Sequence, residues 1–330
     1  MFFEPLRIKN IELKNRSVLP PMCMYQAKED GIAKDFHVAH YAQRALGGMA
    51  LIIQEATAVT PDGRISRNDL GIWSDDHVPG LKRIVQAIKD HGSVAGIQIN
   101  HAGRKAKTDH PMGPTDEPYY PDSSPKAMTI ADIKDTIEAF KQAARRADEA
   151  GYDVLEIHGA HGYLIFEFLS PLTNKRTDRY ADGALFLKEL MQAVYETWPR
   201  NKAVILRISA YEYRKTGIQP EDVARIINAL GENGPDIVHV STGGNVPANI
   251  VPYPGYQLRY ARTVRKITNK ITIGGGLITD LKLAEFALQE GYCDLVFFGR
   301  ALLKDANFVL NHAHEIGVDI EWPKPYERGK

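Results

Sequence analysis

Cysteine is scarce in this sequence of 330 residues, which contains only Cys23 and Cys293. Two cysteines are too few for an iron–sulfur cluster or a disulfide framework, so reduced thiols in a cytoplasmic protein are the simplest interpretation. An excess of charge is also absent, because Lys plus Arg and Asp plus Glu each number 41. Non-specific nucleic-acid binding depends on clustered cations, so this balance argues against nucleic acid as a partner.

Long apolar runs are missing as well. No stretch reaches the roughly 18 residues that a membrane-spanning helix needs. The N-terminus, MFFEPLRIKN, lacks the basic segment and the following apolar segment of a signal peptide. We therefore expect no membrane partner. The chain also lacks repeats, low-complexity tracts and a second-domain boundary, so with 44% apolar residues we expect one domain over residues 1–330.

What the sequence does contain is a regular alternation of short apolar runs with helical patterns. The runs are mostly rich in β-branched residues, as in parallel strands that are buried on both faces. They occupy residues 17–19, 50–54, 94–98, 154–157, 204–208, 237–240, 271–273 and 295–298. Eight strand–helix units predict an α/β fold, a closed (β/α)8 TIM barrel. A doubly wound open sheet is the alternative, but no feature marks a reversal of strand order.

Local patterns refine this barrel. Residues 5–14 alternate apolar and polar side chains, which predicts an N-terminal β-hairpin that plugs the bottom of the barrel. From residue 130 to residue 150 apolar positions recur at helical spacing, with a capping box from Thr129 to Asp132 and Gly151 as the stop.

Three segments are too long to be simple connections between strands and helices. Residues 100–129, 158–184 and 242–257 each follow the carboxyl end of a predicted strand. The first contains five prolines, and we interpret it as a long lid loop after strand three. All three segments should lie on the face where barrels of this kind place their chemistry.

The second long segment opens with the most informative stretch of the chain. His158, His161 and Tyr163 occur within six residues at the end of the fourth predicted strand. Two imidazoles and a phenol this close can hydrogen-bond one oxygen and supply a proton beside it. Satisfied loop histidines next to a core tyrosine are the alternative, but the position at a strand end favours a catalytic site.

This stretch resembles the active-site segment of the Old Yellow Enzyme family, the FMN-dependent ene-reductases. The shared pattern is the His-x-x-His pair, the Tyr two residues later, and then Phe168-Leu169-Ser170-Pro171, Asn174, Arg176, Asp178 and Tyr180. The resemblance extends from Pro5 to Arg328. Segments 69–75, 101–106 and 326–329 are similar to the thermostable-type NADPH dehydrogenase branch.

The resemblance implies an enzyme that uses FMN, with NADPH or NADH as hydride donor. Its substrates would be small activated alkenes, namely α,β-unsaturated carbonyl, imide or nitro compounds. His158 and His161 would bind the substrate oxygen and Tyr163 would donate a proton to carbon. A flavin-free barrel lyase or isomerase and a non-catalytic FMN-binding sensor stay open as alternatives.

The resemblance also implies the flavin site. Pro20, Pro21, Met22 and Cys23 would contact the flavin after the first strand, with Cys23 tuning its potential and Tyr25 binding substrate. Ala56 would pack its backbone against the ring. The Gln98 amide can donate and accept, which matches a pyrimidine edge, and the fixed cation of Arg207 suits negative charge at flavin N1–O2. The alternative for Cys23 is that it packs as a small buried apolar residue. The alternative for Gln98 is that its amide makes an inter-strand hydrogen bond.

The last two strands carry the expected phosphate site. The triplet Gly274-Gly275-Gly276 follows strand seven, and Gly299-Arg300 follows strand eight. Barrel phosphates commonly bind there, on backbone N–H groups and the start of a short helix. A plain turn is the alternative for the triplet. No G-x-G-x-x-G fingerprint is present, and we predict neither a separate dinucleotide-binding domain nor a metal site.

Two features concern assembly and a departure from the family. In the branch that this chain resembles, a terminal arginine reaches the neighbouring subunit's active site, which would assign Arg328 to substrate binding in a homodimer or homotetramer. A disordered tail charge is the alternative.

After Tyr180 the segment 181–186 is several residues shorter than the family pattern, so the passage into the next helix should differ.

Overall fold

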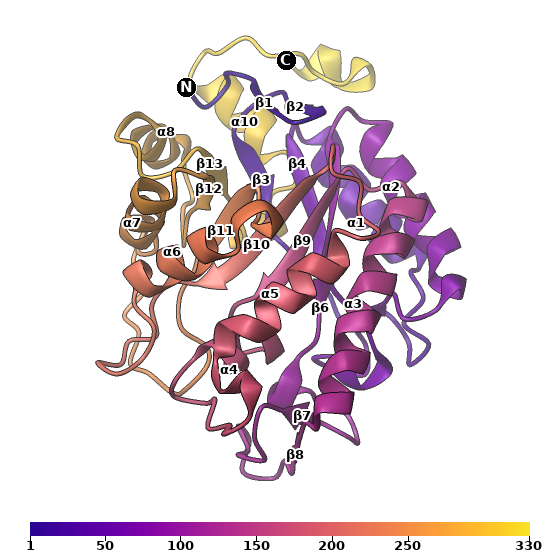
Figure 1. The fold of residues 1–330 in the computed structure, drawn as a ribbon. Helices are drawn as coiled ribbons and strands as arrows, with labels where there is room; N and C mark the ends of the chain where they lie inside the picture. The colour runs from indigo at the N-terminus through magenta and orange to yellow at the C-terminus, as the bar shows by residue number, and fades with distance from the viewer.

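The computed structural model describes residues 1–330 and centres on a ring of eight parallel strands (Figure 1). Because β3 pairs with both β13 and β4, the ring closes. The predicted (β/α)8 barrel is confirmed, and every predicted strand is present. The strands are β3 (Ser17–Leu19), β4 (Leu51–Ala58), β6 (Val94–Asn100), β9 (Val154–Gly159), β10 (Ala203–Ser209), β11 (Ile237–Ser241), β12 (Ile271–Gly274) and β13 (Leu295–Phe297). A short strand, β5 (Leu70–Gly71), adds to β4.

Helices surround the ring and bury their apolar faces against it, in a core cluster of 67 residues. The helix predicted over residues 130–150 has the same bounds in the structure. Its Thr129–Asp132 capping box is formed, and Gly151 ends it in the left-handed conformation. The helices are α1 (Asp35–Leu46), α2 (Val78–Lys89), α3 (Ile130–Ala150), α4 (Leu164–Leu169), α5 (Gly183–Val194), α6 (Pro220–Ala229), α7 (Leu258–Thr268), α8 (Leu281–Gln289), α9 (Arg300–Lys304) and α10 (Phe308–Glu315). None of them combines the length and apolarity needed to cross a membrane.

The barrel interior changes character along its axis. The hairpin β1 (Leu6–Ile8) and β2 (Ile11–Leu13) closes one end, and its side chains join a 14-residue apolar cluster with Val154, Ile205 and Ile237 inside the barrel. The predicted plug is therefore confirmed. Side chains two positions further along each strand face the same way. They are polar and buried: Glu156, Arg207 and His239.

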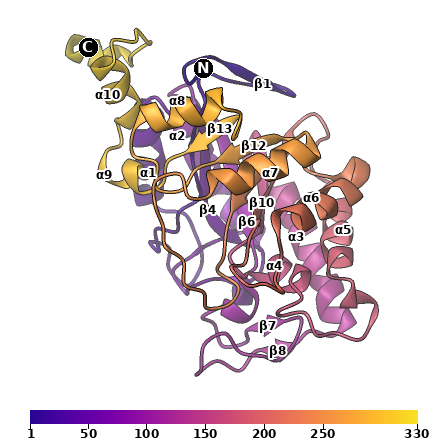
Figure 2. The ribbon, with the colours of Figure 1, turned by 90° about the vertical axis from the view of Figure 1, so that its left-hand side faces the viewer.

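Figures 1 and 2 place the hairpin and both chain termini at one end of the barrel and the long loops at the other. The segment 100–129 has structure of its own, with a 3-10 turn (Gly103–Lys105) and a short parallel pair, β7 (Met112–Gly113) and β8 (Lys126–Ala127). Other 3-10 turns are Pro61–Gly63, Asp75–His77, Arg179–Ala181, Gly231–Asn233 and Lys324–Gly329.

The shortened segment after Tyr180 is accommodated by a cap and a close contact. Asp182 begins α5 by accepting a 3.1 Å hydrogen bond from the Ala184 N–H. At Gly183 an added Cβ would lie 1.9 Å from the carbonyl oxygen of Phe168. Only glycine therefore lets α5 start directly against the end of α4.

Candidate active site

His158, His161 and Tyr163 come together at the loop end of the barrel. His158 belongs to β9, whereas His161 and Tyr163 lie in the turn between β9 and α4. The His158 ring centroid is 5.0 Å from that of His161 and 4.8 Å from that of Tyr163, and both pairs are edge-on. The three rings therefore lie close together, as their spacing in the sequence predicted.

Contacts from three other segments fix this turn. His161 has a positive φ of 60°, its N–H donates to Ser209 Oγ at 3.0 Å, and its Nε2 lies 2.8 Å from Ser241 Oγ. The Nζ of Lys105, in the lid, donates to the carbonyl oxygens of His161 (2.9 Å) and Gly244 (2.8 Å). The lid, β10 and β11 thus hold the strained turn in one conformation.

The protonation states suit hydrogen-bond donation. Burial, reinforced by Arg207 among other cationic groups, holds the pKa of His158 and of His161 well below the ordinary histidine value. Both rings are therefore neutral near pH 7. His158 Nδ1 accepts the Ala160 N–H at 3.2 Å, so its proton resides on Nε2. Burial also raises the pKa of Tyr163, which keeps the phenol protonated.

The loop after β3 borders the same region. The Cys23 thiol is half-buried, and burial raises its pKa while the backbone N–H of Ala56 partly opposes that rise. Burial, with the adjacent Cys23, raises the pKa of the half-exposed Tyr25 to about 12. The carbonyl oxygen of Pro21, in the same loop, lies 3.5 Å from Arg207 Nη1, and Arg207 lines one cavity together with His161.

A buried carboxylate supports that loop, and no sequence motif marks it. Glu55 Oε2 accepts the Met24 N–H at 2.7 Å, and Glu55 Oε1 lies 3.2 Å from the Tyr41 hydroxyl. Burial raises the pKa of Glu55 to about 7. The carboxylate therefore positions the backbone directly after Cys23.

The glycines and Arg300 form one corner of the site, in a cavity of about 210 Å³ that also contains His161 and Arg207. Gly276 has a φ of 98°, and a Cβ there would meet the Tyr256 ring at 2.8 Å. Gly299 lies against the Met22 and Pro20 side chains. The structure thus brings the predicted phosphate site next to the predicted loop after β3.

The residues present fit FMN. Arg207 Nε is buried without a partner, and Nη1 only reaches the Pro21 carbonyl oxygen at 3.5 Å. A fixed cation with unused donors at the barrel mouth suits an electron-rich heterocycle edge. The cavity beyond it ends at Gly276 and Arg300, where a phosphate would meet backbone N–H groups and a second cation.

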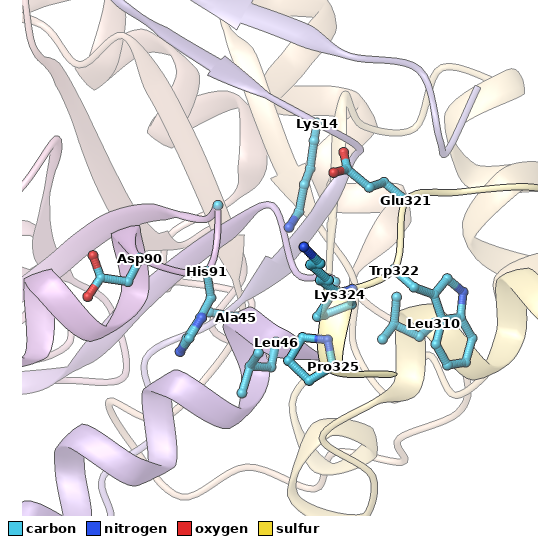
Figure 3. A pocket seen from close by; sticks show the side chains of 13 residues that line it. Lys14, Ala45, Leu46, Asp90, His91, Leu310, Glu321, Trp322, Lys324 and Pro325 are labelled. Atoms are coloured by element: carbon cyan, nitrogen blue, oxygen red, sulfur yellow. The ribbon is translucent and has the colours of Figure 1, made fainter. Parts of the chain in front are cut away.

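Arg328 lies away from this chain's own site. It is exposed in the 3-10 turn Lys324–Gly329, at the hairpin end of the barrel (Figure 1). The same tail covers a second cavity, of about 460 Å³, where Lys14 and Glu321 lie beside each other (Figure 3). Arg328 could therefore act in substrate binding only at the site of another subunit.

Several site residues were missed at the sequence level. Lys105 lies in segment 101–106, which carried part of the family resemblance, but the sequence pattern assigned this residue no role. Tyr256 and Gln257 border the phosphate corner from the loop 242–257, which the sequence analysis identified only as a long segment on the face that carries the chemistry. Gln257 Nε2 reaches Ser241 Oγ at 3.2 Å and Thr242 Oγ1 at 3.1 Å. No short motif marks these positions, because the fold alone brings them to the site.

Comparisons with known proteins agree with this geometry. The family model described as "NADH:flavin oxidoreductase / NADH oxidase family" matches residues 1–317. The NADPH dehydrogenase of Clostridium acetobutylicum is 47% identical over 334 residues, covering 99% of this chain and 98% of that protein. That of Geobacillus thermodenitrificans is 46% identical over 336 residues, covering 100% and 98%. The structure of morphinone reductase in complex with tetrahydroNAD superposes with a TM-score of 0.81 at 25% identity, covering 98% of this chain and 93% of that one.

Proposed function

The chain belongs to the NADH:flavin oxidoreductase / NADH oxidase family, and on that premise we propose that it reduces the C=C bond of activated alkenes. It is an enzyme, an FMN-dependent NAD(P)H oxidoreductase, and the resemblance to the Old Yellow Enzyme family is confirmed. This membership excludes the flavin-free lyase. The substrate class in the proposal is α,β-unsaturated carbonyl, imide or nitro compounds.

The flavin would lie across the barrel mouth. Gly276, Gly299 and Arg300 would hold its phosphate, and Gln98 and Arg207 would meet its pyrimidine edge. The remaining contacts would come from Ala56 and the loop residues Pro20, Pro21, Met22 and Cys23. When bound, FMN would supply the hydride chemistry between the nicotinamide cofactor and the β-carbon of the alkene.

The central motif supplies the rest of the chemistry. His158 Nε2–H and His161 would donate hydrogen bonds to the carbonyl or nitro oxygen, which makes the β-carbon electrophilic. Tyr163 would deliver a proton to the α-carbon. Hydride and proton together add two hydrogens across the double bond. Tyr25 would line the substrate side of the pocket.

The observation that carries this proposal is the pairing of neutral imidazole donors with a protonated phenol in one region. Burial sets both states, and the Ala160 N–H sets the His158 tautomer. A ketone oxygen needs such donors, and its α-carbon needs such an acid.

The test uses purified protein under anaerobic conditions. We expect one non-covalently bound FMN per chain by mass spectrometry, bleaching of the visible band on NADPH addition, and its return with cyclohexenone. A yellow protein that never passes electrons from NADPH to cyclohexenone or a quinone would instead be an FMN sensor. FAD, or no flavin after reconstitution, would overturn the cofactor assignment.

We further propose that residues 1–330 act as one FMN-binding domain in a homodimer or homotetramer. All residues of the site except Arg328 emerge from one end of one barrel. The terminal 3-10 turn Lys324–Gly329, which contains Arg328, lies at the hairpin end instead, away from this chain's own site.

A further inference from the structure

A buried polar network lies in the barrel beneath the proposed flavin site. Gln98 Nε2 donates to Glu156 Oε1 at 2.7 Å, and His239 Nδ1 lies 2.7 Å from Glu156 Oε2. All three side chains are at most 1% exposed. The strand registers pair Gln98 with Glu156, and Arg207 with His239. Four strands, β6, β9, β10 and β11, thus bring their polar side chains together in a buried interior.

The direction of each hydrogen bond is determined by the chemistry. A carboxylate only accepts, so the Gln98 amide must turn its nitrogen toward Glu156. Burial lowers the pKa of His239, although Glu156 opposes this, so the ring is neutral and donates its Nδ1–H. The carbonyl oxygen of Gln98 is thereby left to accept from another group. The N3–H of a flavin pyrimidine is such a donor.

The network also carries charge. Burial lowers the pKa of the Arg207 guanidinium. Among the neighbouring groups that oppose this lowering, Glu156 has the largest effect, so it stabilises the positive charge of Arg207. Because His239 is neutral, the interior below the flavin holds one cation and one anion. Charge interactions persist over longer distances in such a dry site than in water.

We propose that Glu156 is a positioning residue that orients Gln98 and counterbalances Arg207, and so sets the flavin reduction potential; this role rests on the proposed flavin site. Reduction adds negative charge at the N1–O2 edge. Arg207 favours that charge, and the Glu156 carboxylate opposes it. Removing the carboxylate's charge should therefore make the flavin easier to reduce.

The decisive variant is Glu156→Gln, which keeps the shape and removes the charge. The flavin potential of the purified holoprotein is measured by anaerobic equilibration with a reference dye. We expect the ratio of reduced to oxidised flavin at a fixed potential to rise about tenfold, or about 30 mV for a two-electron couple. An unchanged or lower ratio would overturn the proposal.

Two further variants keep the test informative. Tyr152→Phe is the control: it removes a different buried hydrogen bond, from the Tyr152 hydroxyl to Gln54 Oε1, and should leave the flavin potential unchanged. Tyr152 packs in the main core cluster and not in the apolar cluster inside the barrel. If Glu156→Gln fails to fold, the double variant Glu156→Leu with His239→Phe removes both members of the Glu156–His239 hydrogen bond, and replacing both partners of a buried polar pair by apolar groups is often nearly neutral for stability. This double variant should also raise the ratio of reduced to oxidised flavin at a fixed potential. A ratio equal to that of the wild type would refute the role of Glu156.

The flavin content of each variant separates this inference from the proposed function. Wild-type protein without FMN would reject the proposed function itself. FMN retained in wild type and variant, with equal potentials, would reject only the role of Glu156.

Discussion

His158 Nδ1 accepts a hydrogen bond of 3.2 Å from the backbone N–H of Ala160, two residues along the chain. This bond places the ring proton on Nε2, the atom proposed to contact substrate oxygen. Replacing His158 with Ala should slow alkene reduction by about 10²–10³, the usual loss for one donor to a developing oxyanion. Binding of a phenol ligand, measured by its absorbance change, should weaken in parallel. His161→Ala should behave similarly, whereas phenol binding equal to wild type would contradict the assignment.

Tyr163→Phe keeps the ring and removes only the acid. Reduction of the flavin by NADPH should stay near the wild-type rate, because that half-reaction needs no proton from Tyr163. Reoxidation by cyclohexenone should slow by about 10²–10⁴, the typical contribution of a positioned acid. Reoxidation by a quinone should be spared. Stopped-flow traces separate the three reactions.

Tyr195→Phe is the matched control for Tyr163→Phe. Its buried hydroxyl donates to the Gly234 carbonyl oxygen at 2.9 Å, outside the proposed site. It should leave all three rates unchanged. If Tyr163→Phe slows the NADPH step as much as the alkene step, the phenol positions the site rather than protonating carbon.

Cys23→Ala should shift the flavin potential while leaving the fold intact. The sulfur lies against the Ala56 N–H at the proposed flavin edge, whereas the other cysteine, Cys293, is buried in the main core. Cys293→Ala is therefore the control: it should cost about 1 kcal/mol of stability, as point variants commonly do, without moving the potential. Equal potentials for Cys23→Ala and wild type would mean that Cys23 only fills space.

Removing residues 326–330 should weaken substrate binding and leave FMN bound. Arg328 lies far from its own chain's site, so its contribution requires a neighbouring subunit. Steady-state KM for cyclohexenone and flavin content measure the two effects. Lys324→Gln, in the same 3-10 turn, is the control and should change neither. A monomeric wild type by light scattering would exclude the neighbour-reaching role.

Stability should fall with acid through the buried His40. Burial, with Arg44 and His37 nearby, lowers its pKa to about 3, against an ordinary value of 6.5. Between these values the unfolded chain binds the proton more readily, so stability present above about pH 6.5 is lost as pH falls. This histidine contributes at most about 1.4 kcal/mol per pH unit. His40→Phe should therefore flatten the dependence of unfolding free energy between pH 7 and pH 4.5, as measured by urea denaturation.

The exposed His314 provides the control for that measurement. His314→Gln should retain the wild-type slope. Parallel curves for His40→Phe and wild type would show that other groups, rather than His40, govern the acid response.

Short-range patterns allowed much of this architecture to be predicted. The eight strands, the hairpin plug and the capped helix α3 depend on side-chain periodicity and on caps within a few residues. The His158–Tyr163 cluster was also predictable, because its members are neighbours in the chain and sit at the end of a strand.

The sequence by itself therefore determined the barrel, the end that carries the site and the central motif. Only the tertiary structure decided three long-range contacts. Lys105 donates a hydrogen bond to the turn at His161, and Glu55 accepts one from the backbone just after Cys23. His239 hydrogen-bonds Glu156, which lies 83 residues earlier in the chain. These contacts depend on the register in which the strands close the ring. Register is a property of the whole barrel, because each strand's stagger is fixed by packing against both of its neighbours, and no local pattern encodes it.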